Sequence, residues 1–228
     1  MAEPPRALSF PTTPAPAPAP PETFRSLCET MEIEFDDGDL ERLGRFLGAM
    51  LEANAIVNLT AIRSPDEAWV RHVFDALTLI PVLSELDEGS RIIDVGAGGG
   101  VPGVPLGIAM SDQRFTLLDA TGKKVAFLRW VVDLLGLGNV EVIQGRAEHL
   151  GQDRGSRTAQ GREGGHREAY DGAIARAVGP LRVVAELTVP LVRPGGVIVL
   201  VKGDRADEEL EEASNALRVL NAMHVGTV

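Results

Sequence analysis

The 228-residue sequence has one cysteine, four scattered histidines and only 4% aromatic residues. Cys28 has no partner for a disulfide within the chain, which fits a reducing, cytoplasmic setting. The histidines lack metal-ligand spacing, so we expect no metal. No apolar run approaches the roughly 18 residues of a membrane span, and the N-terminus lacks the pattern of a secretory signal. We therefore expect a cytoplasmic protein with one sizeable core and no membrane partner.

Basic residues are outnumbered overall, and the formal net charge is -11, but the charge is unevenly distributed. Residues 1–90 contain 16 acidic and 6 basic residues, whereas residues 91–203 contain 11 acidic and 14 basic residues. The segment from Asp204 onward is acidic again. The middle of the chain thus permits an RNA partner without requiring one, because charged faces kept for solubility explain the charge equally well.

Three regions follow one another along the chain. Alternating proline and alanine predict a disordered tail over residues 1–22. Residues 23–90 show helical periodicity, and Ser64-Pro65-Asp66-Glu67 is a capping box that should open a helix reaching Leu83. Residues 91–228 alternate short apolar strands with helices, which predicts an α/β fold with a doubly wound, Rossmann-like parallel sheet and an N-terminal helical extension. A polar insertion at 151–168 should be a flexible loop.

In such a sheet, ligands bind beyond the carboxyl ends of the strands. Each predicted strand of this sequence delivers a polar or glycine-rich feature there. In chain order these features are Asp94 with its glycine loop, Asp119, Ala147 with Glu148, Arg176, and Lys202. Together they predict a ligand-binding crevice.

The glycine loop "IIDVGAGGGVPG" (92–103) fits two nucleotide fingerprints. From Gly98 it reads G-x-G-x-x-G, typical of dinucleotide sites. From Asp94 it reads D-x-G-x-G-x-G, typical of S-adenosylmethionine sites. A carboxylate at Asp94 would repel a pyrophosphate but attract an ammonium or sulfonium group, and Pro102 lacks a backbone donor for phosphate. The methyl donor is therefore favoured, with Asp94 near its ammonium end, Gly98 in the loop and Asp119 at its ribose.

The residues of the chain restrict which kind of atom it could methylate. Methylation of pyrimidine carbon 5 needs a cysteine nucleophile, and Cys28 lies outside the predicted sheet. Exocyclic amine methylation often uses an Asn/Asp-Pro-Pro-aromatic loop, where this chain has "ARAVGP". A ring nitrogen such as guanine N7 needs no base, only alignment. We expect Arg176 and Lys202 to act at the catalytic site, on guanine O6 and phosphate.

Several segments, in this order and spacing, resemble the RsmG family, also called glucose-inhibited division protein B. They are "NLTAI" (58–62), "RHVFDALTL" (71–79), "IDVGAGGGVPGVPL" (93–106), "LLDATGKKVAFL" (117–128), "GRAEHL" (145–150), "ARAVGPL" (175–181) and "LVKG" (200–203). The resemblance covers about residues 24–220. It implies a class I methyltransferase that uses S-adenosylmethionine to methylate N7 of a guanine in bacterial 16S ribosomal RNA. Its partner would be 16S rRNA or the small ribosomal subunit.

The resemblance also implies roles for individual residues. Cofactor contacts would come from Gly96, Val101, Ala147, Glu148 and Arg176. Candidates for the substrate side are Asn58, Arg71, His72 and Asp75. The family has Asp-Ser where this sequence has Asp75-Ala76, the 151–168 insertion is longer than expected, and a final strand pair would follow where this sequence ends at Val228.

Two alternatives remain open at this point. One is a nicotinamide-dependent oxidoreductase on the dinucleotide interpretation of the loop. The other is a catalytically inactive module that binds S-adenosylmethionine.

Overall fold

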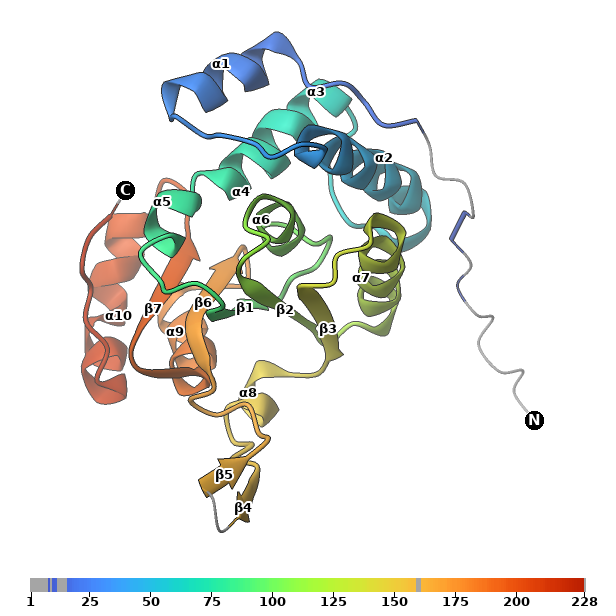
Figure 1. The fold of residues 1–228 in the computed structure, drawn as a ribbon. Coiled ribbons are helices and arrows are strands. Elements are labelled where there is room, and N and C mark those ends of the chain that lie inside the picture. Colours follow the sequence, from blue (N-terminus) through green and yellow to red (C-terminus); the bar gives the residue numbers. More distant parts are fainter. Residues whose placement is uncertain (1–7, 9, 12–15, 159–160, 228) are drawn as a thin grey trace.

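A five-stranded parallel sheet forms the centre of the computed structural model (Figure 1), which describes residues 8, 10, 11, 16–158 and 161–227. The strands run in the order β3-β2-β1-β6-β7, and every neighbouring pair is parallel. Their bounds are Arg91–Val95 (β1), Arg114–Asp119 (β2), Val140–Gln144 (β3), Tyr170–Arg176 (β6) and Val192–Val201 (β7). This confirms the predicted α/β, Rossmann-like fold. The apolar runs of β1 and β2 are explained by burial on both faces, as parallel sheets require.

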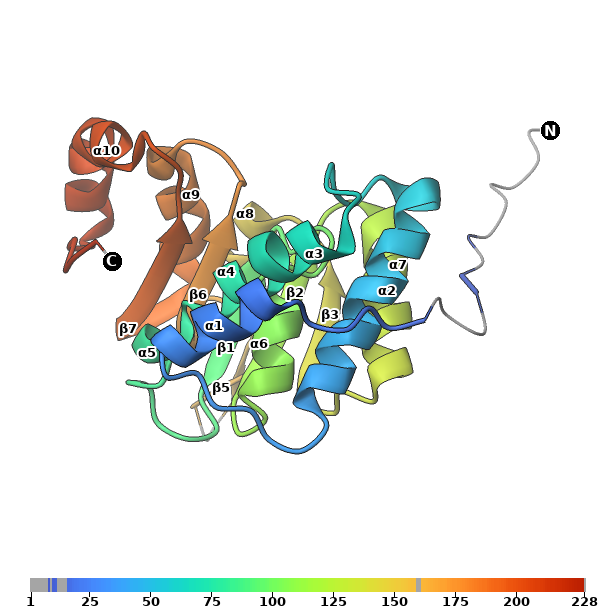
Figure 2. The ribbon, with the colours of Figure 1, turned by 90° about the horizontal axis from the view of Figure 1, so that it is seen from above.

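Helices cover both faces of the sheet (Figures 1 and 2). One face carries α6 (Gly103–Ala109) and α7 (Gly122–Leu135). The other carries α8 (Ala147–Leu150) and α9 (Leu181–Thr188), and α10 (Ala206–Leu220) packs against α9. A short 3-10 helix, η2 (Val189–Leu191), leads into β7.

The N-terminal helices form an additional layer outside α6 and α7 (Figure 1). They are α1 (Glu22–Thr30), α2 (Asp39–Val57), α3 (Pro65–Ala68), the π-helix η1 (Trp69–Phe74), α4 (Asp75–Leu77) and α5 (Ile80–Leu83). Phe46 and Trp69 of this layer belong to the same buried cluster as Val104 and Leu128 of the sheet-covering helices. The extension and the sheet therefore share one hydrophobic core.

The predicted single helix from Ser64 to Leu83 is instead a series of short helical segments. Ser64 accepts a bond from the Glu67 N–H at 3.5 Å, as the capping box predicts. The helix then widens into η1, where the Asp75 N–H reaches the Val70 carbonyl five residues back. It breaks before α5 because Pro81 has no N–H to continue the ladder.

The insertion at 151–168 is also more ordered than predicted. Strands β4 (Ser156–Thr158) and β5 (Gly161–Glu163) pair antiparallel and form a hairpin that projects from the body (Figure 1). The loop prediction was therefore wrong for these residues. A polar sequence can form a short ladder because its backbone groups bond to each other rather than to a core.

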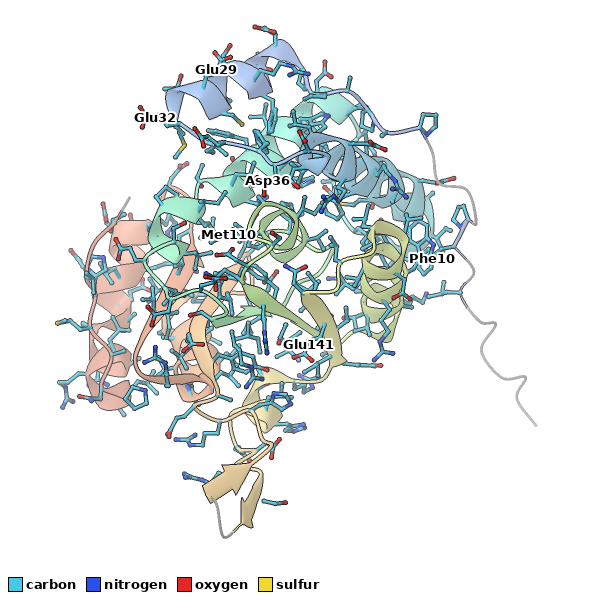
Figure 3. All side chains as sticks on the ribbon, viewed as in Figure 1. Phe10, Glu29, Glu32, Asp36, Met110 and Glu141 are labelled. Carbon is cyan, nitrogen blue, oxygen red and sulfur yellow. The ribbon has the colours of Figure 1, made fainter. Side chains whose placement is uncertain are left out.

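Most of the predicted tail, residues 1–7, 9 and 12–15, lies outside the described residues. Within the described part, Phe10 lies beside α7 (Figure 3). Its ring stacks on Trp130 of that helix at a centroid distance of 5.0 Å. The Pro18 carbonyl accepts a bond from the Trp69 indole N–H at 3.3 Å. This segment thus packs on α7 and η1, and α1 begins just after it.

Candidate active site

The sheet changes its winding direction between β1 and β6. From β1 the chain proceeds outward through β2 to β3, and it then returns to the other side of β1 to add β6 and β7. Ligands of doubly wound sheets bind at such a switch point, beyond the carboxyl ends of the strands. We call the carboxyl ends of these five strands, with the loops that follow them, the carboxyl edge.

Asp119 and the β2 backbone hold the glycine loop in place. The Gly96 and Ala97 N–H groups donate to the Leu118 carbonyl at 2.8 and 3.0 Å. The Asp119 carboxylate accepts from the Gly98 N–H at 3.0 Å and from the Thr121 N–H at 2.7 Å. One carboxylate therefore joins the glycine loop of β1 to the start of the loop after β2.

Asp94 supports the same loop from behind. Its side chain is almost completely buried, and Oδ2 accepts a bond from the Gly103 N–H at 2.9 Å, where α6 begins. Burial raises the pKa of this carboxyl to about 7, against the lowering effect of the Gly103 hydrogen bond. Oδ1 is buried and has no hydrogen-bond partner among the described residues. The sequence argument directed this carboxylate at the ligand, whereas the structure directs Oδ2 at the α6 backbone.

Gly103 permits this contact because it has no side chain. A Cβ built there would lie 2.7 Å from Asp94 Oδ2 and closer still to the Leu117 side chain. Any side chain at this position would force α6 or the neighbouring side chains to shift. The last glycine of the loop is thus a packing requirement rather than a ligand contact.

Gly98 differs from Gly103 because a side chain built there would meet few protein atoms. Its φ of +58° is in the left-handed region, and a Cβ there would meet only the Gly96 carbonyl oxygen at 3.6 Å and Lys124 Nζ at 3.9 Å. A ligand can approach the backbone at this point. Each Asp119 oxygen accepts one backbone bond and keeps a lone pair for a hydroxyl. Open backbone beside a diol acceptor fits the adenosine end of S-adenosylmethionine, and half-buried Val101 lies in the same loop.

On the β6 side, Arg176 joins the sheet to the N-terminal helices. Its Nη2 donates to the Arg71 carbonyl at 2.9 Å, and Nη1 lies 3.9 Å from Asp75 Oδ2. Nη1 is buried and makes no hydrogen bond within the described part of the chain. The structure therefore brings together Arg71, Asp75 and Arg176, although they are about 100 residues apart.

His72 lies between this cluster and the loop that follows α2. It is 8% exposed, and its Nε2 is 2.8 Å from Thr60 Oγ1. Burial lowers the pKa of the imidazole, and the Arg176 charge lowers it further. The ring is therefore neutral at pH 7 and holds the Thr60 loop rather than carrying charge.

Asn54 organises that loop, and the sequence analysis missed it. The buried amide accepts from the Leu59 and Thr60 N–H groups at 2.6 and 2.9 Å and donates to the Thr60 carbonyl at 2.8 Å. This network holds Asn58 in a left-handed conformation and packs Leu59 against Gly99 of the glycine loop. A signal was available, because an asparagine on the apolar face of α2 needs buried partners.

Three predicted site residues lie outside the Arg176 cluster: Lys202, Ala147 and Glu148. Lys202 Nζ is 2.6 Å from Glu209 Oε2 and also donates to the Gly179 carbonyl, so its ammonium is already engaged. Ala147 is buried and Glu148 exposed in the first turn of α8, beyond β3. The structure thus joins Ala147 and Glu148 to the Asp119 side of the carboxyl edge, away from Arg176.

Two further observations concern the described residues as a whole. None of their His, Cys, Asp and Glu side chains cluster in a group of three that could hold a metal ion. No described helix is long and apolar enough to cross a membrane.

A hollow at the opposite, amino edge of the sheet is lined by Arg91, Arg114 and Glu141, among others, and contains none of the predicted site residues.

Known proteins resemble this chain in both sequence and fold. The family model described as rRNA small subunit methyltransferase G matches residues 39–228. Ribosomal RNA small subunit methyltransferase G from Sorangium cellulosum is 46% identical over 209 residues, which is 92% of this chain and 83% of that protein. The same-named protein from Alkaliphilus metalliredigens is 39% identical over 193 residues, 85% of this chain and 76% of that protein.

A solved structure shares the fold. An O-methyltransferase from Bacillus cereus, in complex with SAH, matches with a TM-score of 0.54 over 86% of this chain and 85% of that chain. The sequences are 20% identical, so this likeness shows the class I methyltransferase fold alone.

Proposed function

Because the chain belongs to the rRNA small subunit methyltransferase G family, it is an S-adenosylmethionine-dependent methyltransferase of ribosomal RNA, and we propose that it methylates N7 of a guanine in 16S rRNA. The relatives' names give the small-subunit RNA as the target. The oxidoreductase and the inactive module are not favoured. We further propose a cytoplasmic location, where the small subunit is assembled, with the whole subunit or its RNA as partner.

One observation carries the proposal of site residues. The glycine loop and Asp119 lie on one side of the β1–β6 switch point, and Arg176 with the Arg71–Asp75 segment lies on the other. We propose Gly96, Gly98, Val101 and Asp119 as cofactor contacts, with Ala147 and Glu148 toward the adenine and Asp94 behind the loop. Asn58, Arg71, His72 and Asp75 would shape the RNA side, in the helical extension at 23–90.

When bound, S-adenosylmethionine would supply a methyl group on a cationic sulfur. Guanine N7 would form the new N–C bond as the C–S bond breaks, and S-adenosylhomocysteine would leave. The chain's own residues need only bind and align the reactants, since N7 carries no proton to remove. Arg176 suits this task because its guanidinium lies at the boundary of the two sides and its buried Nη1 has no hydrogen-bond partner within the described residues. A rearrangement of the exposed Asp75 contact would uncover Nη1 and let it donate to guanine O6 while Nη2 keeps its bond to Arg71. Neutral His72 adds no positive charge beside the methylated, cationic base.

The decisive experiment compares three RNA substrates: unmodified 16S rRNA, partly assembled particles and complete small subunits. Each is incubated with the protein and radiolabelled S-adenosylmethionine, and 7-methylguanine is located by borohydride reduction and strand cleavage. We expect one labelled guanine in at least one substrate. Label in another base, or at another guanine atom, would contradict the N7 proposal. Binding of NAD with no binding of S-adenosylmethionine would contradict the cofactor.

Asp119→Ala tests the cofactor side with a matched control. The variant removes the acceptor of the Gly98 and Thr121 N–H groups, and we expect S-adenosylhomocysteine to bind about tenfold more weakly in calorimetry. Asp112→Ala, at an exposed position on the amino edge of the sheet, is the control and should bind normally. Equal affinities for all three proteins would remove Asp119 from the proposed site.

A further inference from the structure

Glu209 makes bonds unlike those of the acidic residues beside it. The first turn of helix α10 contains Asp207, Glu208 and Glu209, a pattern typical of a solvated acidic face. The Glu208 side chain is 68% exposed and pairs with the equally exposed Arg205. The Glu209 side chain is only 22% exposed and is directed inward, toward the carboxyl edge. Its position therefore calls for an explanation other than solubility.

The Glu209 carboxylate ties two segments together. Oε2 lies 2.6 Å from Lys202 Nζ, at the end of β7, and accepts from the Leu181 N–H at 2.8 Å, at the start of α9. Lys202 Nζ also donates to the Gly179 carbonyl. We call this group of Lys202, Glu209, Gly179 and Leu181 the clasp. It encloses the loop at 177–180, which connects β6 to α9 at the arrowhead end of the sheet (Figure 2).

The enclosed loop is strained at its first residue. Ala177 has a φ of +55°, in the left-handed region that costs a residue with a Cβ about 1 kcal/mol. Such a conformation persists only where the surroundings impose it. The clasp supplies this constraint, because it fixes a carbonyl and an N–H within four residues of Ala177.

The loop also reaches the cofactor-binding glycines. A Cβ built on Gly96 would lie 2.8 Å from Val178 Cγ2, so a Val178 methyl group fills the space beside the first glycine of the loop. Val178 is the residue between strained Ala177 and clasped Gly179. Any loosening of the clasp would move this side chain relative to Gly96.

We propose that Glu209 is a positioning residue for the cofactor site: through Lys202 and the Leu181 N–H, it holds the 177–180 loop so that Val178 packs against Gly96. Lys202 then acts through the loop rather than on the RNA. The proposal rests on the assignment of the glycine loop to S-adenosylmethionine. It extends that site to a helix about 110 residues away in the sequence.

The test is a double-mutant cycle on cofactor affinity. Glu209→Ala, Lys202→Met and the double variant are titrated with S-adenosylhomocysteine by calorimetry, well below their melting temperatures. We expect each single variant to bind about tenfold more weakly and the double variant to bind no more weakly than either, because both break the same clasp. Glu208→Ala is the control on the same helix and should bind like the wild type.

Several outcomes would decide against the proposal. Wild-type affinity in folded Glu209→Ala protein would overturn it, and so would independent, additive losses in the two single variants. If Glu209→Ala does not fold, Lys202→Met alone decides, because it breaks the ion pair with Glu209 and leaves the Glu209–Leu181 bond in place. Wild-type affinity in that variant would equally overturn the proposal. Failure of the wild-type protein itself to bind would contradict the cofactor assignment rather than the clasp.

Discussion

On the β1–β2 side of the carboxyl edge, the side chains at the strand ends are carboxylates that accept hydrogen bonds from backbone N–H groups. On the β6–β7 side, the side chains at the strand ends are cations that donate to backbone carbonyls. Asp94 and Asp119 hold the glycine loop in the first way. Arg176 and Lys202 hold η1 and the 177–180 loop in the second. The strand-end residues that the sequence predicts as ligand contacts thus also hold the loops of the site in place.

The two sides differ in burial, and this difference predicts how each responds to change. Asp94 and Asp119 are 1% and 7% exposed, whereas the side chains of Arg176 and Asp75 are 23% and 47% exposed. Buried, short bonds on the acceptor side should be costly to disturb. On the donor side, the Arg176–Asp75 contact is longer, at 3.9 Å, and more exposed, so it should be cheap to lose and able to rearrange when RNA binds.

The largest effect is expected on the acceptor side, where α6 approaches the strands most closely. Gly103→Ala places a methyl group against Asp94 and Leu117, so α6 must shift, and we expect the free energy of unfolding to fall by about 3 kcal/mol. Urea denaturation measures this change. Gly138→Ala is the control, because nothing lies within 4 Å of its Cβ position. A similar, small loss in both variants would show that the contact is not tight.

The second-largest effect on stability is expected from the buried charge of Asp94. Its pKa of about 7 in the folded state is above the unfolded value, so the folded protein binds the extra proton and stability falls as the pH rises from about 4 to 7. Asp94→Asn keeps an acceptor for the Gly103 N–H but carries no charge. Relative to wild type, it should therefore gain about 2 kcal/mol of stability between pH 5 and pH 8.

Comparing the two proteins at each pH removes the contribution of His72. Its lowered pKa acts in the opposite direction, because the unfolded chain takes up a proton below about pH 6.5 that the folded protein does not bind. Urea titrations at pH 5 and pH 8 give the comparison. A constant stability difference between the two proteins would mean that Asp94 is ionised in the folded state at both values.

The sequence predicts which residues reach the carboxyl edge but not how they are used there. Strand ends are set by apolar runs and glycines, so Asp94, Asp119, Arg176 and Lys202 could be placed at one edge. Whether a carboxylate points at a ligand or at the N-terminus of α6 depends on packing around Gly103, which no local pattern records. Glu209 was hidden for a similar reason, since its neighbours make the whole turn look solvated.

The N-terminal helices show the same limit. The capping box at Ser64 predicted where the helix begins, because a cap is a local signal. The π-helix at Trp69–Phe74 was not predicted, since the wider turn coincides with a long-range bond from Arg176 to the Arg71 carbonyl. Asn54, Thr60 and His72 form a network across three segments, and only the fold shows that it is continuous.

A moderate effect is expected at the neutral, partly buried bond between Thr60 and His72, next to the Arg176 cluster. Thr60→Val removes the hydroxyl that contacts His72 Nε2 and the Ile62 N–H. Both groups lose a partner in a partly buried position, and we expect the free energy of unfolding to fall by about 1.5 kcal/mol. Thr30→Val, at an exposed position on α1, is the control. An equal loss of unfolding free energy at both positions would show that the Thr60–His72 bond contributes no stability of its own.

The smallest effect is expected for the longest charge contact of the donor side. Asp75→Asn removes the carboxylate 3.9 Å from Arg176 Nη1, and because Asp75 is about half exposed, the free energy of unfolding should change by less than about 0.5 kcal/mol at physiological salt. Glu67→Gln is the matched control, since Glu67 is 45% exposed and pairs with exposed Arg71. Both differences should shrink in 1 M salt, as screened surface pairs do. A loss above about 1.5 kcal/mol for Asp75→Asn alone would show that Arg176 is held as rigidly as the acceptor side, and the contrast between the two sides would fail.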